Sequence, residues 1–189
     1  GQFELGASAY EKRGTAVMVP AWNSETCVQC NSCAFVCSHA TIRPYLLTAD
    51  EAEKVEGLGA KTLALKNPKL AQYKYTLSVS PLDCMGCGEC TTVCPTKSLT
   101  MVPQESLVKN QPQWDYLVAN VSKKPEVDEL PLSPMTSQYN QPLLEFSGSC
   151  AGCAETSYAR LITQLFGEHM YISNATGCSS IWGGPAATA

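Results

Sequence analysis

The sequence predicts an α+β fold built from two similar halves and a helical segment that follows them. The main observation is a doubled cysteine run: Cys27-x2-Cys30-x2-Cys33-x3-Cys37 recurs as Cys84-x2-Cys87-x2-Cys90-x3-Cys94-Pro95. A short stretch typical of a β-strand flanks each run on both sides. After Cys153, apolar residues recur at helical spacing.

Each half is expected to contain a strand, a short helix and a second strand. The expected strands are residues 17–19 and 42–47 in the first half and residues 75–79 and 98–102 in the second. Residues 31–37 and 88–94, inside the cysteine runs, are expected to form short helices. Two such halves are the internal repeat of a ferredoxin-like domain.

The halves are separated by 46 residues between Cys37 and Cys84, which is too long for a simple turn. Thr48-Ala-Asp-Glu51 is a capping-box pattern that predicts a helix, and Gly57 and Gly59 can end it. A second helical or extended piece is expected over residues 61–73, interrupted by Pro68. This insertion carries no metal ligand, so its expected role is structural packing, with a docking surface as the alternative.

The cysteine runs have the ligand spacing of bacterial two-cluster ferredoxins. A [4Fe–4S] cube has four iron corners, and three cysteines at this spacing can reach three of them. The fourth cysteine of each run points away and binds the other cube. The expected ligand sets are Cys27, Cys30, Cys33 and Cys94 for one cluster, and Cys84, Cys87, Cys90 and Cys37 for the other.

Zinc and disulfides fit these cysteines less well. A zinc site takes four ligands from paired C-x2-C units, so a third cysteine at the same spacing would be surplus. Disulfides between cysteines this close in sequence would be strained, and the total of 11 cysteines is odd. The pattern therefore favours two cubanes that carry single electrons.

Length and composition limit the remaining possibilities. The 189 residues suffice for one or two domains, and the net charge of −4 with no basic run gives no sign of nucleic acid or anionic membrane as a partner. No apolar run reaches membrane-spanning length, and no secretory signal is visible. Cluster thiolates indicate a reducing compartment, either the cytoplasm or an anaerobic organelle. Because the chain starts without Met and stops in a Gly- and Ala-rich stretch, we expect a piece of a longer polypeptide.

The amino-acid composition changes twice after the second half. Residues 103–142 contain six prolines and many Ser, Gln and Asn residues, which predicts an interdomain strap without a core of its own, with residues 114–118 packing against a neighbour. The composition changes again from residue 143: a helix is expected to open at residues 150–153 and to end at Gly167, and residues 171–172 are expected to form a buried strand. The apolar residues expected to be core on this helix are Tyr158, Leu161, Ile162, Leu165 and Phe166.

Three cysteines remain outside the doubled run. Cys150 and Cys153 form a C-x2-C unit, and Cys178 follows in a Gly-rich loop. Spacing alone leaves three readings open: a redox dithiol, half a zinc site, or three ligands of a further cluster whose fourth ligand lies elsewhere. Taken by itself, the loop of residues 177–184 reads as an ordinary tight turn.

Several segments resemble the pyruvate:ferredoxin (flavodoxin) oxidoreductase family. The likeness runs through nearly the whole chain and therefore identifies the family more tightly than the cysteine repeat does. The segments that carry it are Tyr10-Glu-Lys-Arg-Gly14, Cys27-Val-Gln-Cys-Asn-Ser-Cys-Ala-Phe-Val-Cys37, Ala40-Thr-Ile-Arg-Pro44, Val79-Ser-Pro-Leu-Asp-Cys84, Ser147-Gly-Ser-Cys-Ala-Gly-Cys-Ala-Glu-Thr156 and Gly177-Cys-Ser-Ser-Ile-Trp-Gly-Gly184.

The resemblance implies a domain order. Residues 1–20 would be the connector that contains Glu11-Lys12-Arg13, residues 21–105 the dicluster ferredoxin-like domain with its insertion, and residues 106–142 the strap. Residues 143–189 would begin an α/β thiamine-diphosphate domain that is truncated here. The resemblance also implies a third [4Fe–4S] cluster on Cys150, Cys153 and Cys178, and thiamine diphosphate close to Gly177, Cys178, Ser179 and Ser180.

The function implied by the resemblance is electron transfer during oxidative decarboxylation of pyruvate to acetyl-CoA and CO2, with ferredoxin or flavodoxin as acceptor and a homodimer as the full enzyme. Thiamine diphosphate and Mg2+ would belong to the parent enzyme. The chain has no Gly-Asp-Gly…Asn pattern for Mg2+, no coenzyme A site and no expected catalytic residue, so alone it should not oxidise pyruvate.

One departure from the family pattern is Ser38-His39, where the family often has Pro-His. A serine there could donate to a cluster sulfur, and His39 and His169 are expected to be structural or surface residues. Two other classes stay open: an electron-carrier domain or subunit of another redox complex, and a non-redox structural metalloprotein. The first leaves Cys150, Cys153 and Cys178 unexplained.

Overall fold

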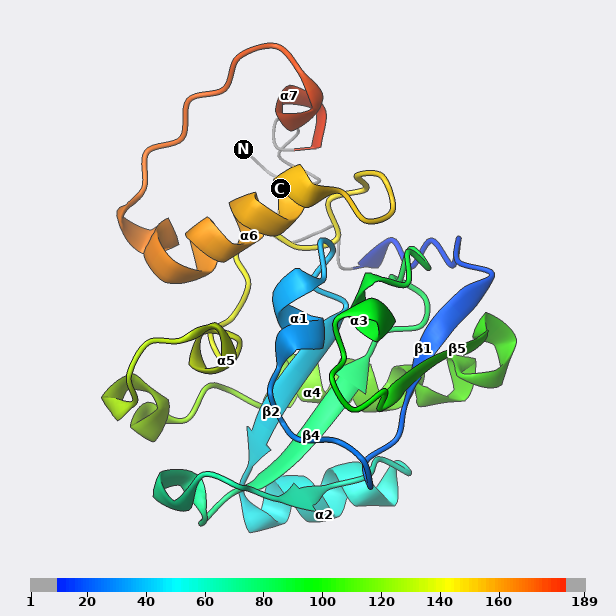
Figure 1. The fold of residues 1–189 in the computed structure, drawn as a ribbon, viewed down its shortest axis with the longest axis vertical. Coiled ribbons are helices and arrows are strands. Elements are labelled where there is room, and N and C mark those ends of the chain that lie inside the picture. The colour runs from blue at the N-terminus through cyan, green and yellow to red at the C-terminus, as the bar shows by residue number, and fades with distance from the viewer. Residues whose placement is uncertain (1–9, 183–189) are drawn as a thin grey trace.

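The fold was analysed in a computed structural model that describes residues 10–182 (Figure 1). It contains both helices and strands, as the α+β prediction requires. In chain order the elements are β1 (Met18–Trp22), α1 (Ser32–Val36), β2 (Ile42–Leu47), α2 (Ala49–Gly57), β3 (Leu63–Ala64), β4 (Lys74–Val79), α3 (Glu89–Thr92), β5 (Leu99–Pro103), α4 (Gln111–Asn120), α5 (Pro134–Ser137), α6 (Ala154–Phe166) and α7 (Cys178–Trp182). The predicted strands and the two short helices of the halves are all present, within a few residues of the expected bounds.

The strands pair across the two halves. β1 of the first half lies antiparallel to β5 of the second, with Met18 opposite Pro103. β2 lies antiparallel to β4, with Ile42 opposite Val79, and β3 adds a short edge to β4. Each ladder therefore takes one long strand from each half, and the halves cannot form as separate units.

The backbone repeats between the halves as closely as the cysteines do. Three positions in each half adopt positive φ, and they correspond in pairs relative to the cysteine runs. The pairs are Gln29 (φ 61) with Gly86 (φ 71), Asn31 (φ 57) with Gly88 (φ 80), and Ala40 (φ 54) with Lys97 (φ 52). Four of these six residues are not glycine, so the cluster-binding loops hold a conformation that is costly for them.

The sheet β2-β4-β3 is covered on both faces (Figure 1). On one face α1 and α3 lie side by side, and Ala34 and Cys33 pack with Ile42 and Leu77. On the other face Leu47 packs with residues of α2 and α4. Alternation along β2 sends neighbouring residues to opposite faces, which is why one strand serves both layers.

The segment between the halves forms the predicted capped helix. Thr48 accepts a hydrogen bond from the backbone N–H of Glu51, and the Glu51 carboxylate accepts one from the N–H of Thr48, so the capping box is complete. Gly59 follows the helix with φ +88. Pro68 begins a short 3-10 turn, Pro68–Leu70, whose Leu70 is buried.

Residues 106–142 contain a helix that the sequence did not lead us to expect, and their buried residues Leu117 and Val127 join clusters of the dicluster domain. Gln111–Asn120 form α4, where Pro112 occupies the first turn and so removes no intrahelical hydrogen bond. Trp114 and Leu117 are fully buried, and Arg43 from β2 stacks on the Trp114 ring at 5.0 Å from its centroid. The prediction that residues 114–118 pack against a neighbour is confirmed, because Leu117 joins the core of the dicluster domain.

The predictions for the last helix and strand were partly wrong. Cys153 caps α6 and Gly167 ends it, as expected. Its apolar residues, however, are not core: Tyr158 is 68% exposed and Phe166 is 56% exposed. The buried side of α6 is a polar stripe of Thr156, Arg160 and Gln164. Residues 171–172 form no strand and are exposed. No helix within residues 10–182 has the length and apolar character needed to cross a membrane.

Candidate metal centres

The first cavity gathers cysteines from both halves. Cys27, Cys30 and Cys33 of the first run line it together with Cys94, the last cysteine of the second run. Trp22 and Tyr75 line it too, with their rings edge to face at 6.2 Å between centroids. This is the set of four cysteines that crossed ligation requires.

A second cavity has the reciprocal composition. Cys84, Cys87 and Cys90 line it together with Cys37 of the first run. α1 carries Cys33 toward one cavity and leads into Cys37 at the other, while α3 carries Cys90 and leads toward Cys94. Because these two short helices are in contact, the last cysteine of each run can reach the cavity that the other run lines.

Backbone N–H groups support the thiols in the same pattern at both cavities. In each half, the residue two positions after the first cysteine donates to its sulfur, and the residue four positions after the last cysteine does likewise. The four bonds are Gln29 N to Cys27 Sγ at 3.4 Å, Gly86 N to Cys84 Sγ at 3.4 Å, Thr41 N to Cys37 Sγ at 3.3 Å, and Ser98 N to Cys94 Sγ at 3.2 Å. Donors aimed at sulfur stabilise thiolate ligands and raise cluster potentials.

The chemistry of the buried thiols suits metal ligation. Burial raises the pKa of Cys33 and of Cys84 to about 12, and it also raises the pKa of Cys90. A thiolate at these positions therefore needs a positive partner, and iron of a cluster supplies one. At Cys94 burial also acts to raise the pKa, but hydrogen bonds led by that of the Ser98 N–H lower it overall.

An unpartnered donor at the first cavity adds to this fit. Trp22 Nε1 is buried, and no acceptor for it lies within residues 10–182. A buried N–H without a partner is costly, and Trp22 lines the cavity that holds four cysteines. Sulfur acceptors of a cubane would satisfy such a donor, so the residues present fit the group.

The loop of Cys150 and Cys153 lies against the second cavity. A Cβ built on Gly152 would stand 3.5 Å from the Cβ of Cys87. His39, which is 4% exposed, bridges the same loop: its Nε2 is 2.9 Å from the carbonyl oxygen of Ser149 and its Nδ1 is 3.0 Å from Ser38 Oγ. The expectation of a structural His39 is confirmed, since it fastens the C-x2-C loop to the end of the first cysteine run.

Cys153 and Cys178 occupy different positions. Cys153 is the N-terminal cap of α6, and hydrogen bonding from the Thr156 backbone lowers its pKa, as the helix start predicts. Cys178 begins α7 and is exposed, beside a turn in which Ser180 Oγ donates to the Gly177 carbonyl at 2.6 Å. Within residues 10–182 no three His, Cys, Asp or Glu side chains are grouped closely enough for a single metal ion, and this holds for the cysteines of both cavities as well as for Cys150, Cys153 and Cys178.

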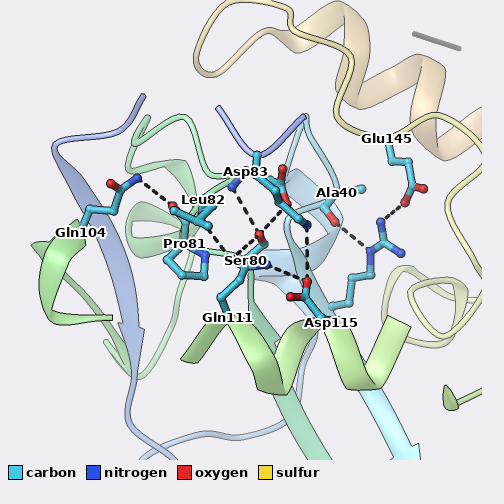
Figure 2. A network of polar contacts seen from close by, with 11 residues as sticks. Ala40, Ser80, Pro81, Leu82, Asp83, Gln104, Gln111, Asp115 and Glu145 are labelled. Carbon is cyan, nitrogen blue, oxygen red and sulfur yellow. Dashed lines mark hydrogen bonds and ion pairs between the residues drawn. The ribbon is translucent and has the colours of Figure 1, made fainter. Parts of the chain in front are cut away.

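The connector is anchored to the second cysteine run. Lys12 Nζ lies 2.8 Å from the carboxylate of Asp83, the residue before Cys84, and 3.5 Å from that of Asp115. Asp83 also accepts from Ser80 Oγ at 2.6 Å, and Gln111 of α4 joins the same network (Figure 2). Glu11-Lys12-Arg13 therefore acts through Lys12 as a clamp on the loop that leads into Cys84.

Comparison with known proteins matches this geometry. Residues 26–98 match the model of the 4Fe-4S dicluster domain family. Over 98% of its length the chain is 51% identical to pyruvate:ferredoxin oxidoreductase of Moorella thermoacetica. It is 49% identical, also over 98%, to pyruvate-flavodoxin oxidoreductase of Enterobacter agglomerans, and 50% identical to that of Klebsiella pneumoniae. The chain is a fragment that matches pyruvate:ferredoxin and pyruvate-flavodoxin oxidoreductases at about 50% identity over 98% of its length.

These matches give the sites a context. The chain spans 16% of the length of each of these three relatives, all of which are named as pyruvate oxidoreductases. It contains a ferredoxin-like 4Fe-4S dicluster domain.

Sequence reasoning missed one residue near these sites. Arg160 of α6 is 1% exposed and reaches back to α1, the helix before Cys37. The signal was available, since Thr156, Arg160 and Gln164 follow one another at the spacing of one helix face. It was overlooked because the opposite face is the apolar one.

Proposed function

We propose that this chain is the electron exit of an enzyme that oxidises pyruvate to acetyl-CoA and CO2, and that its clusters pass electrons to ferredoxin or flavodoxin. The carrying observation is that each of two cavities is lined by three cysteines of one run and the last cysteine of the other. The names of the relatives support pyruvate as substrate and ferredoxin or flavodoxin as acceptor.

The proposed ligand sets follow the two cavities. One [4Fe–4S] cluster is held by Cys27, Cys30, Cys33 and Cys94, and the other by Cys84, Cys87, Cys90 and Cys37. When bound, each cluster accepts and releases one electron at a time. The protein surrounds them with N–H donors and apolar residues that tune their potentials.

The proposed electron route has a direction in space. The loop of Cys150 and Cys153 lies against Cys87 and is fastened through His39, so an electron arriving there meets the cluster of Cys84, Cys87, Cys90 and Cys37 first. The cluster of Cys27, Cys30, Cys33 and Cys94 is then the outer one, from which a soluble carrier takes electrons.

The end of the chain is proposed to begin a thiamine-diphosphate domain from residue 143. Cys150, Cys153 and Cys178 would supply three ligands of a third cluster, with the fourth from the rest of the enzyme, and Gly177 to Ser180 would lie near thiamine diphosphate and Mg2+. The exposed apolar face of α6 supports this, because a helix with such a face is normally covered. In this proposal residues 1–20 form the connector, residues 21–105 the dicluster domain with its insertion, and residues 106–142 the strap. The full enzyme is proposed to be a homodimer.

Anaerobic reconstitution of the chain tests the proposal. We expect roughly eight irons per chain, two interacting cubane signals in the reduced protein, and no acetyl-CoA from pyruvate, coenzyme A and thiamine diphosphate. Roughly twelve irons would mean that the chain completes a third cluster alone. A redox-silent chain that retains zinc would refute the electron-transfer function.

A further inference from the structure

Arg160 places a buried positive charge beside the end of α1, two residues before the second-cluster ligand Cys37. One of its terminal nitrogens donates to the backbone carbonyl of Phe35 at 2.5 Å, and Ser157, one turn earlier on α6, donates to the carbonyl of Val36 at 3.3 Å. Phe35 and Val36 are the residues directly before Cys37. α6 therefore docks on the chain at the point where it enters the ligand of the second cavity.

Every partner of the Arg160 side chain is neutral. Its other terminal nitrogen donates to Gln138 Oε1 at 3.1 Å and to Gln164 Oε1 at 2.5 Å, and Nε has no acceptor in the described residues. Within residues 10–182 no carboxylate lies in ion-pairing range of it, whereas buried Arg43 pairs with Glu145 and buried Lys124 pairs with Glu51. A buried cation without a counter-ion is strongly unfavourable, so its countercharge must come from another group.

The second cluster is the group that can supply this charge. Four thiolates give a cubane a net negative charge, and reduction adds one more negative charge. Burial lowers the pKa of Arg160, and the charge of the Cys37 thiolate opposes that change. Building on the proposed cluster function, we infer that Arg160 is a potential-setting residue that makes the cluster of Cys37, Cys84, Cys87 and Cys90 easier to reduce.

The inference predicts a change confined to one cluster. Arg160→Gln keeps a hydrogen-bond donor but removes the charge, so the midpoint potential of the second cluster should become more negative. We expect the equilibrium constant for its reduction to fall about tenfold, which for one electron is a shift of about 59 mV. Arg160→Lys keeps the charge and should leave the potential close to that of the unsubstituted protein.

A second variant neutralises Arg160 without removing it. Gln164→Glu is nearly isosteric and places a carboxylate at the oxygen that Arg160 already contacts at 2.5 Å. It should shift the same cluster in the same direction. Lys54→Gln removes an exposed charge from α2, away from both cavities, and is the matched control in which neither potential should move.

The measurement is an EPR-monitored redox titration of the reconstituted chain, with iron content determined for each variant. Single-cluster variants Cys30→Ala and Cys87→Ala assign the two signals. The inference is overturned if Arg160→Gln or Gln164→Glu leaves the second potential unchanged, if both clusters shift equally, or if Arg160→Lys shifts as far as Arg160→Gln. If the Arg160→Gln variant loses its iron, the midpoint potential of the second cluster in the Gln164→Glu variant tests the inference instead. Two cubanes with unshifted potentials contradict only this inference, whereas the absence of cubanes in the unsubstituted chain contradicts the proposed function as well.

Discussion

Gly152 lies directly against Cys87, with 3.5 Å between a Cβ built on the glycine and the Cβ of the cysteine. The two residues come from the C-x2-C loop before α6 and from the second cysteine run, and Gly152 holds φ +70. A side chain here would strain the backbone, because the left-handed region is unfavourable for L-residues, although a Cβ would meet Cys87 only at ordinary contact distance. The C-x2-C loop before α6 therefore packs directly on a ligand of the second cavity.

Gly152→Ala should destabilise the reconstituted chain by about 1–2 kcal/mol, because an L-residue is strained in the left-handed region. Anaerobic urea unfolding measures the effect. The matched control is Gly57→Ala at the end of α2, where no atom lies within 4 Å of the added carbon, and it should be neutral or slightly stabilising. Equal effects of the two substitutions would contradict the left-handed backbone conformation at Gly152.

Crossed ligation predicts which cysteine variants resemble one another. Cys94→Ala should remove the same cluster as Cys30→Ala, since both side chains line the first cavity, and should leave the same residual EPR spectrum. Cys37→Ala should match Cys87→Ala for the same reason. If Cys94→Ala instead matched Cys87→Ala, each run would ligate its own cluster and the assignment would be wrong.

The clamp of the connector predicts a loss of stability in Lys12→Met. The Asp83 side chain is 4% exposed, so removing its partner at 2.8 Å leaves a buried carboxylate held by Ser80 and should cost about 1–2 kcal/mol. Lys123→Met breaks an exposed pair with Asp128 and should cost less than about 0.5 kcal/mol. Urea unfolding of both variants measures the two losses of stability. Equal losses would contradict a stabilising role of the Lys12 clamp.

The ion pair of Glu51 and Lys124 ties α2 to the chain beyond α4, at 2.7 Å. Burial acts to raise the pKa of Glu51, but the Lys124 hydrogen bond and the capping box lower it below its usual 4.5. Because the pKa of this carboxyl group is lower in the folded protein than in the unfolded chain, its ionised form stabilises the fold at pH values above the unfolded pKa. That stabilisation is lost as the pH falls through the folded pKa. Glu51→Gln should therefore cost about 1 kcal/mol, constant from about pH 8 to 5.5, by urea unfolding. A cost that vanishes within that range would contradict the pairing.

The halves were predictable because their signals are local. Ligand spacing placed Cys27 and Cys84, and the capping box placed α2. The pairing of β1 with β5 could not be predicted from either strand alone, because the alternation of residues shows which face is buried but not which strand is the neighbour. The pairing agrees with the exchange of Cys37 and Cys94 between the two cavities.

The later elements could not be predicted in the same way. Helix α4 was missed because the prolines and polar residues of residues 103–142 were taken as the composition of a strap, although the first turn of a helix accepts proline, as at Pro112. For α6 the periodicity predicted the helix correctly. It could not tell which face meets the dicluster domain, because polar residues with matched hydrogen bonds can be buried there instead.

Helix α6 therefore predicts a reversal of the usual mutational pattern. Thr156 is 0% exposed and its hydroxyl bonds Ser149 Oγ at 3.0 Å and the Cys153 carbonyl at 3.1 Å, so the isosteric Thr156→Val should cost about 1–2 kcal/mol by leaving these groups unsatisfied. Ile162 is 45% exposed on the opposite face, so Ile162→Ser should cost less than about 1 kcal/mol and should reduce self-association.

Urea unfolding and analytical ultracentrifugation of the reconstituted variants measure these two effects. A larger cost for Ile162→Ser than for Thr156→Val would mean that the apolar face is the buried one and that α6 docks the other way round. In the longer enzyme proposed above the order should change, because a face that the remainder of that enzyme covers would make Ile162→Ser costly while Thr156→Val keeps its cost. Such a difference between this chain and the longer enzyme would identify the apolar face of α6 as the surface that packs against the rest of that enzyme.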